Sequence, residues 1–249
     1  MNVALFGGTF DPIHRGHLAV AKAAQHDYGL KQILFIPSGA PPHKHDPALT
    51  PFIHRYAMVA LAISGQAGMT PSLVESPHEL GNRPAYSIDT VRRIRATLKA
   101  TDRLFFIIGI DAFLDIAKWH QPEAVLRETE FIVASRPGYS LGDLGDALPE
   151  SLRPPEPVRR ALRNQAAKGE IVLPGITIHL LPEVTEHVSA THVRKAAARS
   201  GSQLRSLVGP AVADYIHKTG LYRNTVQTGH DSATPKVLQM TPRRRQKTI

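Results

Sequence analysis

The sequence contains no cysteine and few aromatic residues, and both absences restrict its chemistry. Among its 249 residues there is one tryptophan, and aromatic side chains make up 6% of the chain. Without cysteine the chain can form no disulfide, no thiolate metal site and no cysteine nucleophile. This composition fits a reducing compartment, and we therefore expect a cytoplasmic protein.

Long hydrophobic runs are also missing. The longest apolar stretches, such as LFFIIGI at 104–110, are far shorter than the roughly 20 residues that cross a bilayer. The N-terminus lacks the charged region and apolar stretch of a secretory signal. We expect neither a membrane span nor a membrane partner.

Positive charge is in excess. Thirty Lys and Arg residues against 21 Asp and Glu residues give a formal net charge of +9, which favours acidic partners such as nucleotides, nucleic acid or anionic lipid. Part of this excess lies in the final stretch PKVLQMTPRRRQKTI, which shows no hydrophobic periodicity. We expect one domain over 1–223 and a basic, disordered tail over 224–249.

Short β-rich runs alternate with helical patterns along the chain. Strands are predicted at 2–7, 32–37, 104–109, 130–135 and 176–181, and amphipathic helices at 17–30, 53–66 and 87–100. This alternation predicts an α/β fold with a doubly wound parallel sheet, followed by a small C-terminal helical part. The proline-rich, charged stretch 139–175 is predicted to be a surface excursion with one basic helix near 158–168.

The first strand ends in an unusual loop, GGTFDPIHRGHL at 7–18. Gly7 and Gly8 allow the backbone to turn tightly and to approach a ligand without a Cβ in the way. His14 precedes the next helix and His17 falls in its first turn, so both imidazoles and the helix N–H groups can face one phosphate. The loop is neither a Walker loop nor a GxGxxG fingerprint, and it predicts an anion site.

These residues resemble the HxGH nucleotidyltransferase superfamily, and GGTFDPIHRGH is similar to the form found in bacterial nicotinate-nucleotide adenylyltransferases. The segments IPSGAPPHK, PAYSIDTV, FIIGIDAF, KWH, ASRPGY and VSATHVRK follow in the order of that family, so the resemblance covers about 2–223. It implies a Rossmann-like nucleotidyltransferase fold and transfer of AMP from ATP to nicotinate mononucleotide, giving deamido-NAD and pyrophosphate in NAD biosynthesis. It also implies Mg²⁺ that arrives with ATP and is not held by a dedicated protein site.

The resemblance implies an ATP site built from two motifs. In the second motif, VSATHVRK stands where the family shows ISSTxxR, so that hydroxyls, helix amides and a guanidinium converge on the polyphosphate. Asp111 fits a ribose or adenylate contact and a helix cap equally well. The catalytic residues implied are His14, His17 and Arg194, and the ATP-binding residues are Gly7, Gly8, Thr9, Phe10, His14, His17, Asp111, Ser189, Thr191 and Arg194.

The same resemblance implies an acceptor site across the cleft. Trp119 would stack on the pyridine ring, and Thr90 would offer hydroxyl and backbone donors to the nicotinate carboxylate. A packing role for Trp119 and a solvent-facing Arg136 remain open at this point. The nicotinate mononucleotide-binding residues implied are Ser38, His43, Lys44, Ser87, Thr90, Trp119 and Arg136.

Two alternative functions share some of these features. Pantetheine-phosphate adenylyltransferases carry the first motif, but they are shorter and lack the PPHK loop and KWH as they stand here. A nucleic-acid-binding protein would explain the charge of +9 and the RRR tail, but it leaves HRGH and SATHVR without a role. We therefore expect ATP and nicotinate mononucleotide as partners and no nucleic acid, while the sequence leaves a homo-oligomeric state open.

Overall fold

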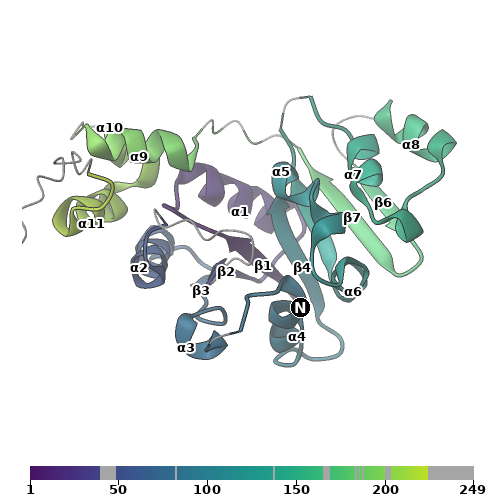
Figure 1. Ribbon diagram of the computed structural model, residues 1–249, viewed down its shortest axis with the longest axis horizontal. Helices are drawn as coiled ribbons and strands as arrows, with labels where there is room; N and C mark the ends of the chain where they lie inside the picture. The colour runs from purple at the N-terminus through teal and green to yellow at the C-terminus, as the bar shows by residue number, and fades with distance from the viewer. Residues whose placement is uncertain are drawn as a thin grey trace, which may run out of the picture.

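A seven-stranded, mostly parallel sheet forms the centre of the molecule, as seen in the computed structural model (Figure 1). The structure describes residues 1–39, 49–81, 83–136, 138–164, 169–182, 184, 186, 188–199 and 203–223. The strand order is β3-β2-β1-β4-β5-β7-β6, and only β6 runs antiparallel to its neighbour. The strands are β1 (Asn2–Gly8), β2 (Gln32–Pro37), β3 (Met69–Pro71), β4 (Arg103–Gly109), β5 (Glu130–Ala134), β6 (Gly169–Leu173) and β7 (Ile176–Leu181).

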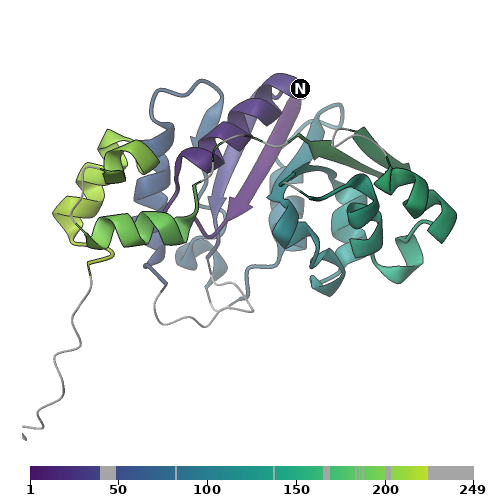
Figure 2. The same ribbon diagram turned by 90° about the horizontal axis from the view of Figure 1, so that it is seen from above.

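Helices cover both faces of this sheet, which confirms the predicted doubly wound α/β class (Figures 1 and 2). On one face α1 and α2 pack with the C-terminal helices α9, α10 and α11; on the other lie α4, α5, α6 and α7. The helices are α1 (Arg15–Asp27), α2 (Phe52–Ile63), α3 (Pro77–Leu80), α4 (Ser87–Arg95), α5 (Ile110–Phe113), α6 (Pro122–Glu128), α7 (Leu141–Ala147), α8 (Glu156–Arg163), α9 (Ala190–Ala198), α10 (Gln203–Val208) and α11 (Pro210–Thr219), with short 3₁₀ turns at Ile116–Lys118 and Glu150–Leu152.

The central strands are apolar over their whole length because both of their faces are covered. In β4 the five residues between the two ends are all buried, which is typical of a parallel strand with helices on either side. The five predicted strands are therefore found at nearly their predicted positions. The edge strands β3 and β6 were not predicted, because β3 has only three residues and β6 only five, with a single buried side chain.

The strand order reverses between β1 and β4, and this reversal determines where a ligand can bind. The connection from β1 leads to β2 on one side, whereas β4 leads to β5 on the other. In an open α/β sheet the loops therefore separate at this point and leave a crevice beyond the carboxyl ends of the strands. Gly7 and Gly8 still belong to β1, and the loop that follows Gly8 leaves the strand at this point.

The stretch 139–175 differs from the predicted surface excursion. Its first part forms α7, whose N-terminus is a capping box in which Ser140 and Asp143 exchange hydrogen bonds. Leu141, Leu144 and Leu148 are all 0% exposed and belong to the core beside β4 and β5. The prediction was wrong for this part because leucines spaced at three and four residues were outweighed by the surrounding prolines and charges.

The rest of this stretch fits the prediction better. The basic helix is present as α8, ending at Arg163, and its arginines Arg159 and Arg163 both pair with Asp146 of α7. The chain then returns to the sheet as β6, which the prediction did not include.

The C-terminal region contains the small helical part that was predicted, α9 to α11. The predicted tail 224–249 lies outside the described residues. Within the described ranges, no helix combines the length and apolarity needed to cross a bilayer.

Replacement of Leu144 by alanine tests whether α7 is part of the core. We expect Leu144→Ala to lower the free energy of unfolding by about 2–5 kcal/mol, because a fully buried leucine leaves a cavity. The measurement is urea unfolding followed by circular dichroism. Val158→Ala on α8 is the control, since Val158 is 48% exposed and should cost little. Equal, small effects of both substitutions would show that α7 does not contribute to the core.

Candidate active site

A cleft of about 560 Å³ opens at the carboxyl ends of β1, β4 and β5. Gly7, Gly109 and Ala134 contribute the strand ends, and the first residues of α1 and the residues around the N-terminus of α9 complete the wall. The cleft therefore lies at the point where the strand order reverses. Both sequence motifs contribute to it, with His14, Gly16 and His17 from the first and Ser189 and Ala190 from the second.

The two histidines of the first motif are stacked against each other. Their ring centroids are 3.8 Å apart with an angle of 28° between the planes. His14 is the N-cap residue of α1, and its backbone N–H donates a hydrogen bond of 3.2 Å to Nδ1 of His17. Because Nδ1 of His17 is an acceptor, a neutral His17 carries its proton on Nε2.

Both histidines are held in the neutral form. Burial lowers the pKa of His14 to about 4, and the positive charge of Arg136 adds to this effect. Burial also lowers the pKa of His17 well below its ordinary value, with a further contribution from His14. At neutral pH the pair therefore offers N–H dipoles and no full positive charges.

Gly16 makes room for this arrangement. A Cβ at position 16 would lie 3.1 Å from Nδ1 of His14 and 3.4 Å from the backbone oxygen of Val188. Within the described part of the chain, Nδ1 of His14 is buried and has no hydrogen-bond partner. A side chain at position 16 would therefore push apart the His14 ring and the segment that leads into α9.

The second motif is anchored to the first by Arg194. Ser189 caps α9 by accepting a hydrogen bond of 3.2 Å from the backbone N–H of His192. Arg194 donates to the backbone oxygen of Asp11 at 2.7 Å and to Oγ1 of Thr191 at 3.3 Å. Among the residues that line the cleft, the second motif thus contributes Ser189 and Ala190, while the guanidinium of Arg194 joins α9 to the loop after β1.

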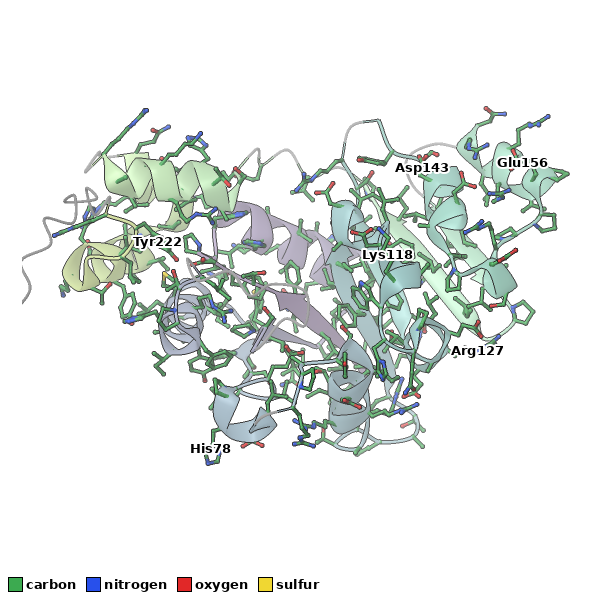
Figure 3. The ribbon with its side chains drawn as sticks, in the orientation of Figure 1. His78, Lys118, Arg127, Asp143, Glu156 and Tyr222 are labelled. Atoms are coloured by element: carbon green, nitrogen blue, oxygen red, sulfur yellow. The ribbon has the colours of Figure 1, made fainter. Side chains whose placement is uncertain are left out.

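Asp11 connects the same loop to the end of the described chain. Its carboxylate accepts a hydrogen bond of 2.5 Å from the hydroxyl of Tyr222 and one of 3.4 Å from the backbone N–H of Thr50. Burial and the neighbouring carboxylate raise the pKa of Tyr222, so the phenol remains a donor. Figure 3 shows Tyr222 beside α2 and α11, far from Asp143 and Glu156 at the other end of the molecule.

Arg136 and Asp111 lie at the rim of this cleft as an ion pair of 2.7 Å. Arg136 follows β5 and lines the cleft together with His14, whereas the sequence prediction grouped it with the acceptor residues. Asp111 lies in the first turn of the short helix α5 and was predicted on the ATP side. Their pairing places both residues on the side of the two motifs.

The aromatic residue predicted for the acceptor lies on the other face of the sheet. Trp119 is partly exposed and packs edge-on against Phe106 of β4, with ring centroids 5.9 Å apart. The Phe106 ring in turn lies 3.4 Å from the position that a Cβ at Gly7 would occupy. The Phe106 ring therefore lies between Gly7, near the end of β1, and Trp119 on the opposite face.

Thr90 is used differently from the prediction. Its hydroxyl donates a hydrogen bond of 2.7 Å to Oε1 of Glu75, and its backbone N–H bonds to the oxygen of Tyr86. A hydroxyl has one proton to donate, so it is not free for a substrate carboxylate while Glu75 holds it. Burial raises the pKa of Glu75, and the Thr90 hydroxyl opposes that shift.

The remaining predicted residues are placed as follows. Ser87 is the first residue of α4, and Ser38 directly follows β2 with its hydroxyl buried. Phe10 is 2% exposed, and its ring centroid lies 5.0 Å from that of His17. Phe10 therefore packs against the histidine ring and restricts its orientation. His43 and Lys44 lie outside the described residues.

Sequence reasoning missed several polar residues around the site. Asp11, Arg55, Glu75 and Tyr222 are buried or partly buried, and each is hydrogen-bonded to a loop or helix that carries predicted site residues. One signal was available for Arg55, a charged residue in the otherwise apolar helical pattern IHRYAMVALA. Ser135, which also lines the cleft, lies in the segment ASRPGY but was not singled out, and Glu186 carried no signal because it lies in an irregular loop.

Comparisons with known proteins identify the family of this chain. The family model described as cytidylyltransferase-like matches residues 5–196. A protein of Moorella thermoacetica named "Probable nicotinate-nucleotide adenylyltransferase" is 36% identical over 89% of this chain and 91% of its own length. One of the same name from Pseudomonas aeruginosa strain UCBPP-PA14 is 38% identical over 89% of this chain and 97% of its own.

Solved structures confirm the fold. Plasmodium falciparum nicotinic acid mononucleotide adenylyltransferase complexed with NaAD superposes with a TM-score of 0.63 at 18% identity, covering 89% of this chain and 97% of that chain. The resemblance identified from the sequence motifs is thus confirmed. This chain belongs to the cytidylyltransferase-like family and, within it, to the nicotinate-nucleotide adenylyltransferases.

Proposed function

We propose that this protein transfers the adenylyl group of ATP to nicotinate mononucleotide, forming deamido-NAD and pyrophosphate. The observation that carries this proposal is the convergence of the stacked histidines and the N-terminus of α9 on one cleft. The names of relatives at 36–38% identity support the choice of acceptor. The expected cytoplasmic location, the absence of nucleic acid among its partners and the oligomeric state remain predictions.

The ATP side offers several donors to a triphosphate. The helices α1, of 13 residues, and α9, of nine, direct their N-terminal N–H groups toward the cleft and favour negative charge there. The neutral imidazoles of His14 and His17 add N–H dipoles, and Arg136 adds a full positive charge at the rim. Such fixed dipoles stabilise charge that grows in the transition state without reorganising.

We infer a direct in-line transfer. A phosphate oxygen of nicotinate mononucleotide attacks the α-phosphorus of ATP, the bond to the bridging oxygen breaks, and pyrophosphate leaves. Because a phosphate oxygen is already anionic near pH 7, no side chain has to remove a proton from it. Catalysis then depends on alignment of the two substrates and on stabilisation of the charge on the transferred group.

Arg194 takes an indirect part in this scheme. Its guanidinium is engaged by the Asp11 oxygen and by Thr191, so in this conformation it holds the two motifs together. A shift of either contact on ATP binding would free donors for the phosphates. This positioning role differs from the direct catalytic role predicted from the sequence. In either role, Arg194 would be needed for the transfer step.

The cleft fits a magnesium ion that enters with ATP. Glu186 lines the cleft and Asp111 at its rim is paired with Arg136, while the described residues contain no group of three or more His, Asp or Glu arranged as metal ligands. Mg²⁺ retains water and phosphate ligands more readily than it fills an all-protein cage, so this donor set suits it. When bound with ATP, Mg²⁺ offsets the negative charge of the phosphates.

The acceptor pocket is proposed on the opposite face, around Trp119. The indole packs against Phe106 in a T-shaped arrangement and is partly exposed, so the part that faces solvent can contact a pyridinium ring. Stacking of this kind is worth about 0.5–2 kcal/mol. The N-terminus of α4, with Ser87 as its first residue, supplies N–H groups that favour the nicotinate carboxylate over an amide.

Product analysis tests the acceptor. With ATP and Mg²⁺, we expect the protein to form deamido-NAD from nicotinate mononucleotide at a higher kcat/KM than NAD from nicotinamide mononucleotide, measured by chromatography.

Replacement of Trp119 tests the proposed stacking. Trp119→Ala should raise KM for nicotinate mononucleotide more than KM for ATP, and Trp119→Phe should bring KM for nicotinate mononucleotide part of the way back, because the stacking surface returns. Turnover of 4′-phosphopantetheine alone, or an effect of Trp119→Ala confined to ATP, would contradict the assignment.

Removal of the second histidine tests the transition-state role. His17→Ala should lower kcat by about 100- to 1000-fold, the usual cost of losing one such donor, with a smaller change in KM for ATP. His26→Ala is the matched control, because His26 is exposed at the other end of α1 and should leave kcat unchanged. A kcat near that of the unaltered protein in His17→Ala would exclude this residue from catalysis.

Nuclear magnetic resonance of the histidine rings tests their charge. An ordinary histidine, with a pKa near 6.5, is mostly protonated at pH 5.5. Since burial lowers the pKa of His14 to about 4, its ring should still be neutral at that pH, and the His17 ring should protonate only well below the ordinary range, because burial lowers its pKa as well. His14→Gln and His17→Gln assign the signals, and titration of either ring near pH 6.5 would contradict the neutral pair.

A further inference from the structure

Arg55 is the largest fully buried side chain whose role is not yet explained. It lies in the first turn of α2 and is 1% exposed, although arginine is rarely buried unless its charge is matched. The rest of the buried face of α2 is apolar, with Met58, Val59 and Ile63 in the core. A buried charged side chain lowers the stability of the fold unless its N–H groups find hydrogen-bond acceptors.

Its guanidinium donates to three backbone oxygens. Nε bonds to the oxygen of Thr50 at 2.8 Å, Nη1 to that of Thr9 at 2.7 Å and Nη2 to that of Ser38 at 2.7 Å. All three distances are short, as expected for hydrogen bonds from an ionised donor. The planar fork therefore holds three separate segments of backbone in one fixed geometry.

These segments are the ones that diverge at the carboxyl edge of the sheet. Strands β1 and β2 are paired as far as Gly8 and Pro37, and the N–H of Ser38 makes one more bond to the oxygen of Gly8 at 2.9 Å. Beyond this point the chain continues through Thr9 into the loop between β1 and α1, which we call the ATP-side loop. The chain at Ser38 and Gly39, which follows β2, is called the acceptor-side loop. Arg55 therefore bridges the two loops at the point where they separate.

Neighbouring carboxylates balance the charge of Arg55. Asp11 accepts from the backbone N–H of Thr50, the same residue whose oxygen is held by Nε of Arg55. Glu75 accepts from the N–H of Gly39 at 3.4 Å, next to the Ser38 oxygen that Nη2 holds. The buried cation is thus placed between one carboxylate of the ATP-side loop and one of the acceptor side.

We propose that Arg55 is a positioning residue that sets the distance between the ATP-side loop and the acceptor-side loop through its bonds to Thr9 and Ser38. This inference rests on the proposed function, in which ATP and nicotinate mononucleotide react in one transfer step, and on the sequence resemblance, which implies Thr9 for ATP and Ser38 for the acceptor. It goes beyond that function because Arg55 touches neither substrate. Its effect is on how the acceptor oxygen and the α-phosphorus are aligned.

A positioning role predicts a particular kinetic pattern. Each loop retains its own residues for binding, so loss of the bridge should leave each KM nearly unchanged. Alignment of the two substrates should suffer, and a displacement of about 1 Å can cost roughly 100-fold in rate. A role in stability alone predicts instead a lower melting temperature with an unchanged kcat.

Arg95 provides a matched control at the opposite edge of the sheet. Its guanidinium also donates to two backbone oxygens, those of Asp102 and Glu128, each at 3.0 Å. These contacts tie α4 to the segments that precede β4 and β5, at the amino ends of the strands. Arg95→Met removes a comparable set of bonds without touching the loops of the site.

The experiment compares Arg55→Met, Arg55→Lys and Arg95→Met with the unaltered protein. Steady-state rates of deamido-NAD formation are measured with each substrate varied in turn, and melting temperatures by circular dichroism. We expect both Arg55 variants to lose about 10- to 100-fold in kcat with each KM within about threefold, because the single ammonium of lysine cannot reach three oxygens. Arg95→Met should melt earlier and retain its kcat.

Other outcomes would overturn the proposal. An unchanged kcat in Arg55→Lys would show that charge alone suffices, and a large rise in one KM would assign Arg55 to a single binding site. If Arg55→Met does not fold, Arg55→Lys decides; if neither folds even in sucrose, which favours the compact state, the residue serves stability alone. An unaltered protein that forms no deamido-NAD refutes the proposed function itself, and an active one with normal Arg55 variants refutes only this inference.

Discussion

The backbone that leaves β1 is the part of the molecule on which the site depends. Between Gly8 and His14 it forms neither helix nor strand, so its carbonyl oxygens find no partners in a regular ladder. Side chains from elsewhere supply them: Arg55 holds the oxygen of Thr9, and Arg194 holds that of Asp11. A loop that must present its backbone closely to a ligand is thus made rigid by two distant arginines.

This arrangement explains why the C-terminal helices are part of the catalytic unit. Arg194 is in α9, and Tyr222 follows α11 and donates to the Asp11 carboxylate. Two contacts from residues more than 180 positions away in the sequence therefore converge on one residue of the first motif. The helical part contributes the end of α9 that lines the cleft and also the hydrogen bonds that fix the loop after β1.

The sequence predicted the central strands and the two motifs at the cleft because these features are local. Apolar runs indicate buried parallel strands, and glycines, caps and histidines at fixed spacing indicate a helix entrance. Partners that lie far apart in the sequence leave no local signal, so the hydrogen bond from the buried Thr90 to Glu75 and the exposed ion pair of Arg136 with Asp111 could not be read from spacing. The core position of α7 was missed for a related reason: its leucines become significant only when the sheet beside them is known.

The charge state of the two histidines determines whether they would stabilise the bound substrate or the transition state. A buried imidazolium pair would attract a triphosphate strongly, but it would bind substrate and transition state alike and would repel itself at a ring separation of 3.8 Å. Neutral rings avoid that cost, and their N–H groups gain strength only as charge grows on the transferred phosphoryl oxygens. In the proposed mechanism, the burial that lowers both pKa values would therefore move stabilisation from the bound substrate to the transition state.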